Sequence, residues 1–213
     1  MQPPDPLPII GRAAVIPVLT IERAEDAVPL ARALVAGGLP VLEVTLRTAA
    51  ALDALERIAK EVPEATVGAG TLTTPADISA AVAIGAKYVV TPGTPAELAV
   101  ALAQTPIPSI PGCATVSEAM ALAVQGFKTL KFFPAEASGG TAWLKAVASP
   151  LPDLRFCPTG GIDGNNAAAY LALANVAAVG GSWVTPKDAI AAGNFSHISA
   201  LARAAAGLRG QRK

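Results

Sequence analysis

Eight short apolar runs recur along the 213-residue chain, and stretches rich in alanine and other helix formers separate them. The runs are AAVIPVLT (13–20), PVLEVTL (40–46), ATVGAG (65–70), KYVVTPG (87–93), IPSIPG (107–112), TLKFFPA (129–135), RFCPTGG (155–161) and VAAVGGS (176–182). Continuously apolar strands are typical of parallel sheets that helices cover on both faces. Eight strand–helix pairs in this length predict an α/β fold, a single closed (β/α)8 TIM barrel. An open doubly wound sheet is the alternative, but no G-x-G-x-x-G follows the first run.

Local sequence signals predict where the intervening helices begin and end. Three segments combine threonine at the N-cap, proline at N1 and an acid at N3: TPAD (74–77), TPAE (94–97) and TPKD (185–188). TVSE (115–118) has the capping-box pattern. Glycine marks the expected helix ends in VAGG (35–38), AIGA (83–86) and VQGF (124–127).

Composition narrows the class of protein. The 16 basic and 16 acidic residues give no net charge, so nothing predicts electrostatic affinity for nucleic acid. No apolar run reaches the ~20 residues of a membrane helix, and the N-terminus lacks the pattern of a secretory signal. Cys113 and Cys157 form no C-x-x-C pair and have no nearby histidine, which argues against a zinc site or a disulfide framework. We therefore expect a soluble, cytoplasmic protein.

The length also fits one domain over residues 1–213. Within it, residues 1–12 form a proline-rich N-terminal segment, and residues 208–213 form a basic tail that reads as a frayed helix end.

Unusual polar residues fall at the ends of the predicted strands, where barrels of this type carry function. In VLEVTLRT, residues Glu43, Thr45 and Arg47 alternate with apolar ones, so they share one face of the strand. In TLKFFP, Lys131 sits in an apolar run and shares its face with Phe133. We expect Glu43, Arg47 and Lys131 to converge on one barrel mouth.

The same three residues also have plain structural interpretations. Glu43 and Arg47 could form an ion pair that closes the barrel, and Lys131 could bury its stem and leave its ammonium in water. Convergence on one cavity favours chemistry instead. An amine poorly solvated among Leu130, Phe132 and Phe133 is more often neutral, and a neutral amine can form an iminium with a ketone.

The remaining roles follow from that iminium. Glu43 is a candidate for the proton transfers. The planar guanidinium of Arg47 can bind a substrate carboxylate through two parallel hydrogen bonds. The set indicates an aldolase for a 2-keto acid that needs no metal and no cofactor. His197 lies in NFSHISALARAA, away from the strand ends, and reads as an ordinary helix residue.

Glycine-rich turns close the seventh and eighth runs, in PTGG (158–161) and VGGS (179–182). Glycines at these two loops let backbone amides approach an anion, and barrels often bind phosphate there. The sequence therefore predicts a phosphorylated substrate.

The segments VLEVTLRT, VGAGT, TPG, KFFPAE, RFCPTGGI and GGSWV resemble, in order and spacing, the 2-dehydro-3-deoxy-phosphogluconate (KDPG) aldolases. These are class I aldolases of the Entner–Doudoroff pathway, and the resemblance runs from about Val15 to the last helices. It implies cleavage of 2-dehydro-3-deoxy-6-phospho-D-gluconate into pyruvate and D-glyceraldehyde 3-phosphate by a homotrimer. Cleavage of 4-hydroxy-2-oxoglutarate into pyruvate and glyoxylate is a plausible side activity.

The resemblance also implies roles for individual residues. Lys131 would form the Schiff base and Glu43 would act as general acid and base. The pyruvate pocket would be lined by Arg47, Thr71, Pro92 and Phe133. The far end of the substrate and its phosphate would be held by Thr159, Gly160, Gly161, Gly181 and Ser182. Asp163 departs from the family pattern and could compete for amides at the phosphate end.

Three alternatives stay open at this point. The substrate could be the galactonate-derived epimer, because the sequence does not fix the stereochemistry at C4. A phosphate-binding barrel could instead be an isomerase or epimerase, which has no need of Lys131. A non-catalytic ligand-binding trimer could also retain the fold.

Overall fold

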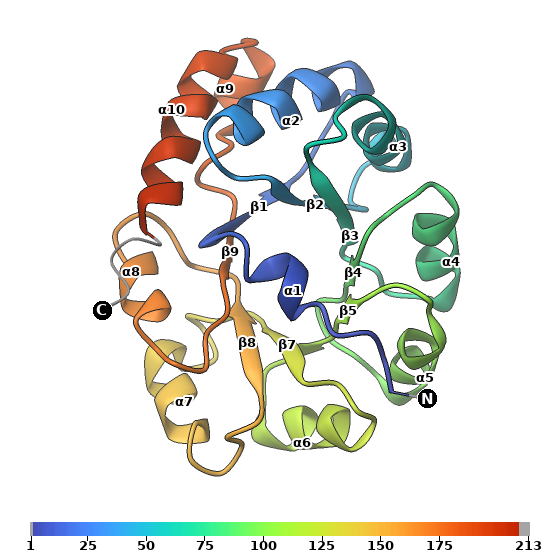
Figure 1. The fold of residues 1–213 in the computed structure, drawn as a ribbon, viewed down its shortest axis with the longest axis vertical. Helices are drawn as coiled ribbons and strands as arrows, with labels where there is room; N and C mark the ends of the chain where they lie inside the picture. Colours follow the sequence, from blue (N-terminus) through green and yellow to red (C-terminus); the bar gives the residue numbers. More distant parts are fainter. Residues whose placement is uncertain (1, 209–213) are drawn as a thin grey trace.

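The computed structural model describes residues 2–208. Its strands are β1 (Val15–Leu19), β2 (Val41–Thr45), β3 (Thr66–Gly70), β4 (Val89–Val90), β5 (Ser109–Ile110), β6 (Gly112–Cys113), β7 (Thr129–Phe132), β8 (Arg155–Pro158) and β9 (Val179–Gly181). Its helices are α1 (Leu7–Ile10), α2 (Ala27–Ala36), α3 (Ala51–Glu61), α4 (Pro75–Ala83), α5 (Ala96–Gln104), α6 (Val116–Val124), α7 (Gly140–Val147), α8 (Ala167–Leu171), α9 (Lys187–Ala191) and α10 (Phe195–Ala206), with a 3-10 turn η1 (Ala24–Asp26). The strands lie centrally, and all the α-helices except α1 surround them (Figure 1).

The strands form two parallel sheets, so the prediction of one closed eight-stranded barrel is wrong. Six strands lie in the order β5-β4-β3-β2-β1-β9, and three lie in the order β6-β7-β8. Between β8 and the segment that contains β9, the only pairings within the described residues are the isolated bridges Phe156–Val176 and Thr159–Gly180. The α/β class and the parallel pairing of consecutive strands are as expected.

Prolines explain where the hydrogen-bonded ladder stops, because a proline has no N–H to donate. The fifth expected run is broken at Pro111 into β5 and β6, which join different sheets. Pro158 ends β8 just before the bridge at Thr159. The fourth run, expected over 87–93, pairs as a strand only at Val89–Val90.

Side chains of the strands alternate between two hydrophobic cores, as the period of two requires. In β1, Val15 and Leu19 belong to the outer core beneath the helices, whereas Ile16 belongs to an inner core. The inner core also includes Tyr88, and it includes Ile10 from the N-terminal segment. The strands are therefore buried on both sides.

The N-terminal segment closes one end of the inner core. Helix α1 lies over the centre of the strand arrangement in Figure 1. Ile10 is fully buried there, and Asp5 accepts a hydrogen bond from the Thr129 hydroxyl at 3.0 Å.

Apart from Leu208, the predicted basic tail lies outside the described residues. Treating the chain as one domain stays a prediction.

The helix signals were right at two of the four proposed N-caps. Thr74 and Thr115 both form capping boxes, with Asp77 and Glu118 respectively. At α5 and α9 the expected threonine caps are wrong, because prolines occupy the N-cap positions and no side chain caps either helix.

The two remaining threonines use their hydroxyls in the loops. Thr94 donates to the carbonyl of Gly112, and Thr185 donates to the carbonyl of Ser182.

The glycines expected at helix ends behave as predicted: Gly38, Gly85 and Gly126 have φ of 90°, 97° and 95°. Within residues 2–208, no helix has the length and apolar character needed to cross a membrane.

The capping box of α6 makes stability depend on pH. The Glu118 carboxylate accepts N–H groups of Ala114 and Thr115, at 2.7 and 2.9 Å, and these hydrogen bonds hold its pKa below the ordinary value. A lowered folded-state pKa means that the ionised cap stabilises the fold above the unfolded-state pKa, and that this gain disappears as the pH falls through the folded-state pKa.

We therefore expect Glu118→Gln to lower the free energy of unfolding at pH 7 by about 0.5–1 kcal/mol. Urea unfolding at pH 7 and at low pH measures this, and the difference from wild type should vanish at low pH. Glu97→Gln is the matched control, because Glu97 lies in the first turn of α5, which has no side-chain cap. A Glu118→Gln effect that did not change with pH would contradict the assignment.

Candidate active site

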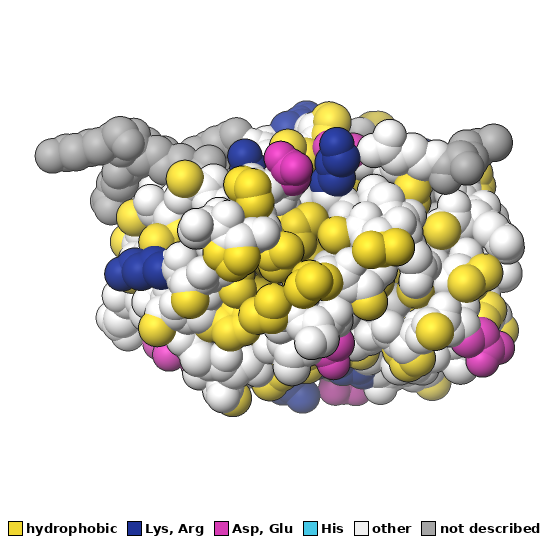
Figure 2. Space-filling model, turned by 90° about the horizontal axis from the view of Figure 1, so that it is seen from below, with side chains coloured by type: hydrophobic (Ala, Val, Ile, Leu, Met, Phe, Trp, Pro, Cys, Tyr) yellow, Lys and Arg dark blue, Asp and Glu magenta, His cyan; other side chains and the backbone are white. Residues whose placement is uncertain are grey.

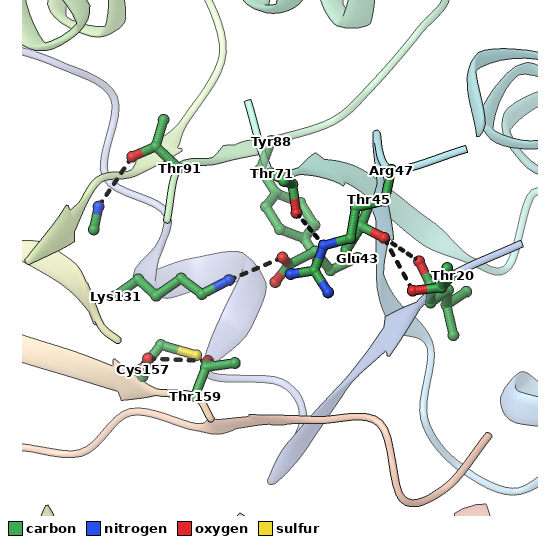
Figure 3. Close-up of polar contacts among 12 residues, drawn as sticks. Thr20, Glu43, Thr45, Arg47, Thr71, Tyr88, Thr91, Lys131, Cys157 and Thr159 are labelled. Carbon is green, nitrogen blue, oxygen red and sulfur yellow. Dashed lines mark hydrogen bonds and ion pairs between the residues drawn. The ribbon is translucent and has the colours of Figure 1, made fainter. Parts of the chain in front are cut away.

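A buried ion pair joins the two sheets across the interior. Lys131 extends from β7 and Glu43 from β2, and Nζ of the lysine donates to Oε1 of the glutamate at 3.0 Å (Figure 3). Each side chain is 4% exposed. Burying two charges is unfavourable unless they are paired, so each group holds the other in place.

The surroundings of Lys131 differ from those expected from the sequence. Leu130 and Phe132 belong to the outer core, on the opposite face of β7. Inside, Lys131 lies in register with Gly112 of β6 and Cys157 of β8, and its Nζ is 5.5 Å from the centre of the Phe133 ring. Of the three expected apolar neighbours, therefore, only Phe133 lies near the amine, and the neighbouring strands supply the rest of its surroundings.

Room for the Glu43 carboxylate comes from a glycine on the next strand. A Cβ added to Gly70 of β3 would lie 2.1 Å from Oε1 of Glu43, so a side chain there would have to displace the carboxylate. Two residues earlier, a Cβ on Gly68 would lie 2.5 Å from the ring of Tyr88. Tyr88 donates its hydroxyl to the carbonyl of Leu42 at 2.8 Å, and burial holds its pKa well above the ordinary value. The Tyr88 hydroxyl is therefore uncharged, and its ring forms part of the wall of the interior.

Arg47 lies at the mouth of the interior. Its Nε donates to the Thr71 hydroxyl at 3.0 Å (Figure 3). Thr71 has a φ of 61°, which is rare for a residue other than glycine and turns the chain sharply after β3. Thr45, on the same face of β2, instead donates to the carbonyl of Leu19.

A cavity of about 530 Å³ opens over the carboxyl ends of several strands. Among the predicted site residues, those that line it are Arg47, Phe133, Thr159, Gly160, Gly161, Gly181 and Ser182. The four that do not line it are Glu43, Lys131, Thr71 and Pro92. Pro92 instead contacts the backbone of β6, because its carbonyl lies 2.4 Å from where a Cβ on Gly112 would be.

Glycines shape the walls of this cavity. Gly160 and Gly161 have φ of 100° and 76°, and a Cβ on Gly161 would lie 2.7 Å from the side chain of Glu136. A Cβ on Gly180 would lie 2.3 Å from the Thr159 hydroxyl. These residues bring backbone close to the cavity, as an anion site requires.

The sequence interpretation did not identify three residues that shape the site. Gly70 was missed, although the alternation of Gly68 and Gly70 in VGAG shows that one face of β3 lacks side chains. Thr20 and Lys187 also line the cavity. Lys187 was missed because TPKD was interpreted only as the start of a helix.

Of the other titratable groups, Cys157 lies beside Lys131 on the neighbouring strand β8. Cys113 and Cys157 are free, and burial raises the pKa of each thiol to about 12. His197 lies exposed in α10, as expected, where its backbone N–H donates to Oδ1 of Asn194. Asp163 accepts the N–H of Asn165 at 2.7 Å. In the part of the chain described here, no group of three or more His, Cys, Asp or Glu residues could hold a metal ion.

Comparison with known proteins places this site in a family. The model of the KDPG and KHG aldolases matches residues 8–201. The chain belongs to this family. The KHG/KDPG aldolase of Escherichia coli strain K12 is 50% identical over 197 residues, which cover 92% of each chain.

Further relatives agree. The 2-dehydro-3-deoxy-phosphogluconate aldolase of Dickeya dadantii is also 50% identical, with the same coverage. The KDPG aldolase of Legionella pneumophila, crystallised with pyruvate captured as a covalent carbinolamine, superposes with a TM-score of 0.93. It is 47% identical, and the match covers 95% of this chain and 98% of that one.

The contact between Gly70 and Glu43 gives a direct test of the ion pair. In Gly70→Ala the new methyl group must displace the flexible Glu43 carboxylate, which separates it from Lys131. We expect the rate of pyruvate release from KDPG to fall about 10- to 100-fold, because a displaced acid–base group loses much of its effect.

Circular dichroism would check that Gly70→Ala still folds. Gly207→Ala is the control, because nothing lies within 4 Å of an added Cβ there. Wild-type turnover in a folded Gly70→Ala protein would show that the position of Glu43 does not matter.

Proposed function

We propose that the protein is a class I aldolase that cleaves 2-dehydro-3-deoxy-6-phospho-D-gluconate into pyruvate and D-glyceraldehyde 3-phosphate, as in the Entner–Doudoroff pathway. The observation that carries this proposal is the buried amine of Lys131, 3.0 Å from the Glu43 carboxylate and 5.5 Å from the ring of Phe133, which lines the open cavity. Membership of the KDPG and KHG aldolase family supports the same reaction.

The reaction begins with one proton transfer inside the pair. Moving a proton from Nζ of Lys131 to Oε1 of Glu43 leaves a neutral amine and a neutral carboxylic acid. The amine attacks the C2 ketone, and the resulting carbinolamine loses water with a proton from Glu43 to give an iminium. The captured carbinolamine of the Legionella enzyme supports this route for the present chain.

Cleavage then uses the iminium as an electron sink. A carboxylate, Glu43 directly or through water, takes the proton of the C4 hydroxyl, and the C3–C4 bond breaks. The electron pair of the C3–C4 bond moves into the iminium to form an enamine, and the aldehyde leaves. Protonation of the enamine at C3 and hydrolysis of the iminium release pyruvate and restore the amine.

The other predicted residues would divide the substrate between them. Arg47, held by Thr71, would bind the carboxylate next to the ketone, and Pro92 and Phe133 would enclose the pyruvate carbons. Thr159 and Ser182 would hold the far end. The phosphate would also bind to the backbone N–H groups of Gly160, Gly161 and Gly181.

The relatives support the choice of substrate. Those named for the gluconate substrate are 38–50% identical to this chain, whereas a structure described as native KDPGal is 25% identical. This favours the gluconate series over its epimer. The Escherichia coli relative is named for KHG as well, so we also propose cleavage of 4-hydroxy-2-oxoglutarate. The cytoplasmic location stays a prediction.

Trapping with borohydride tests the Schiff base. Incubation with pyruvate and borohydride should add the mass of one reduced pyruvate to the peptide that contains Lys131, and Lys131→Ala should abolish both the adduct and turnover. Lys128→Ala is the matched control, since Lys128 is exposed and lies just before β7. A folded wild-type protein that gave no adduct would refute the aldolase proposal.

We also propose that the protein is a homotrimer. Helix α6 exposes Val116, Met120 and Val124 at a spacing of four residues, by 39%, 53% and 89%, and α5 exposes Val100. Figure 2 shows hydrophobic side chains gathered on the side of the molecule where α6 and α7 lie. An exposed apolar stripe of this kind is typical of an interface, and a second copy of the chain is the partner that the resemblance implies.

Placing a charge in this stripe should weaken the assembly. Sedimentation of the wild type should give about three times the 21.3 kDa of one chain, and Met120→Lys should shift the mass towards one chain. Ala121→Lys is the control, because Ala121 is also exposed on α6 but lies off the stripe. A wild-type protein that sedimented as one chain would contradict the trimer.

A further inference from the structure

The cavity carries two positive charges that lie at different places on its wall. Of the described residues that line it, the charged ones are Arg47 and Lys187, both cations. Arg47 follows β2, whereas Lys187 follows β9 and begins α9. Since the sheet order is β2-β1-β9, the strands that precede the two cations flank β1 on opposite sides. A ligand with an anionic group at each end fits this arrangement.

The two cations have different partners. Arg47 is held by the Thr71 hydroxyl, which lies one residue after Gly70, the glycine that faces the Glu43 carboxylate. Lys187 lines the same cavity together with Gly181 and Ser182 of the predicted phosphate site. The sequence interpretation left it without a role, and the backbone glycines alone were expected to bind the anion.

Lys187 is only loosely held. Its Nζ lies 3.6 Å from Oε1 of Glu22, and the two side chains are 78% and 64% exposed. An exposed pair at this distance is weak. A doubly charged phosphate can therefore compete with the Glu22 carboxylate for the same ammonium.

We propose that Lys187 is a specificity-determining residue that selects a phosphorylated, six-carbon substrate over a shorter dicarboxylate, and that Glu22 restrains it until the phosphate binds. This deepens the proposed aldolase function and rests on it. A five-carbon 2-keto diacid has no phosphate and ends closer to the ketone. Its second carboxylate therefore stays short of Lys187.

The test compares two substrates in the same enzyme. In Lys187→Met, the ratio of kcat/KM for KDPG to kcat/KM for 4-hydroxy-2-oxoglutarate should fall about threefold to tenfold, chiefly through a higher KM for KDPG. Lys187→Arg should restore most of the ratio. Lys145→Met is the matched control, because Lys145 is an exposed lysine on α7, and it should keep the wild-type ratio.

Ionic strength gives a second readout. The kcat/KM of the wild type for KDPG should fall as salt is added, and this dependence should be weaker in Lys187→Met, because an exposed ammonium–phosphate contact is screened. An unchanged substrate ratio together with an unchanged salt dependence would overturn the proposal. Equal losses for both substrates would also overturn it, since they would place Lys187 in a general structural role.

The restraint by Glu22 is tested by a double-mutant cycle. Glu22→Gln should lower the KM for KDPG about twofold in the wild-type background and have no effect in the Lys187→Met background. The same effect in both backgrounds would mean that Glu22 acts without Lys187. Failure of the aldolase function itself is distinguishable, because the wild type would then cleave neither substrate and form no adduct at Lys131.

Discussion

The buried pair of Lys131 and Glu43 is the interaction on which the rest of this structure depends. A lone charge in this interior would be strongly unfavourable, so each side chain requires the other. The two come from β7 and β2, which belong to different sheets. The sheets must therefore face each other closely enough for a lysine to reach across, and the surrounding strands must leave space for the carboxylate. Gly70 provides that space.

The incomplete closure of the sheets is related to the shape of the site. On the β9 side Pro158 has no N–H to donate, whereas on the β7 side Thr159 and Gly160 keep backbone hydrogen bonds, and the chain continues into Gly160 and Gly161, which line the cavity. A regular strand would direct alternate side chains towards this space and would keep backbone in the ladder. The break instead brings glycine backbone to the cavity, where an anion can approach it.

The two ends of the cavity differ in solvation, and this difference suits their proposed roles. The pair at the pyruvate end is 4% exposed, so water does not screen the interaction between the amine and the carboxylate. At the other end Lys187 and Glu22 are mostly exposed, so their contribution is small and sensitive to salt. We infer that the buried end determines the rate of the chemistry and the exposed end discriminates between substrates.

The sequence by itself determined the local features of this protein. Alternation in VLEVTLRT and TLKFFP put Glu43 and Lys131 on strand faces, and the patterns at Thr74 and Thr115 predicted real caps, because such signals depend only on residues close in the chain. The closed barrel and the threonine caps at 94 and 185 were wrong, and of the apolar neighbours expected around Lys131 only Phe133 lies near its amine. Continuity of a sheet, the partner of a hydroxyl and the packing around a side chain depend on residues distant in sequence. Only the tertiary structure could show that Gly70 makes room for Glu43 and that Lys187 reaches the cavity, because both facts are distances between strands and loops that the chain brings together by folding.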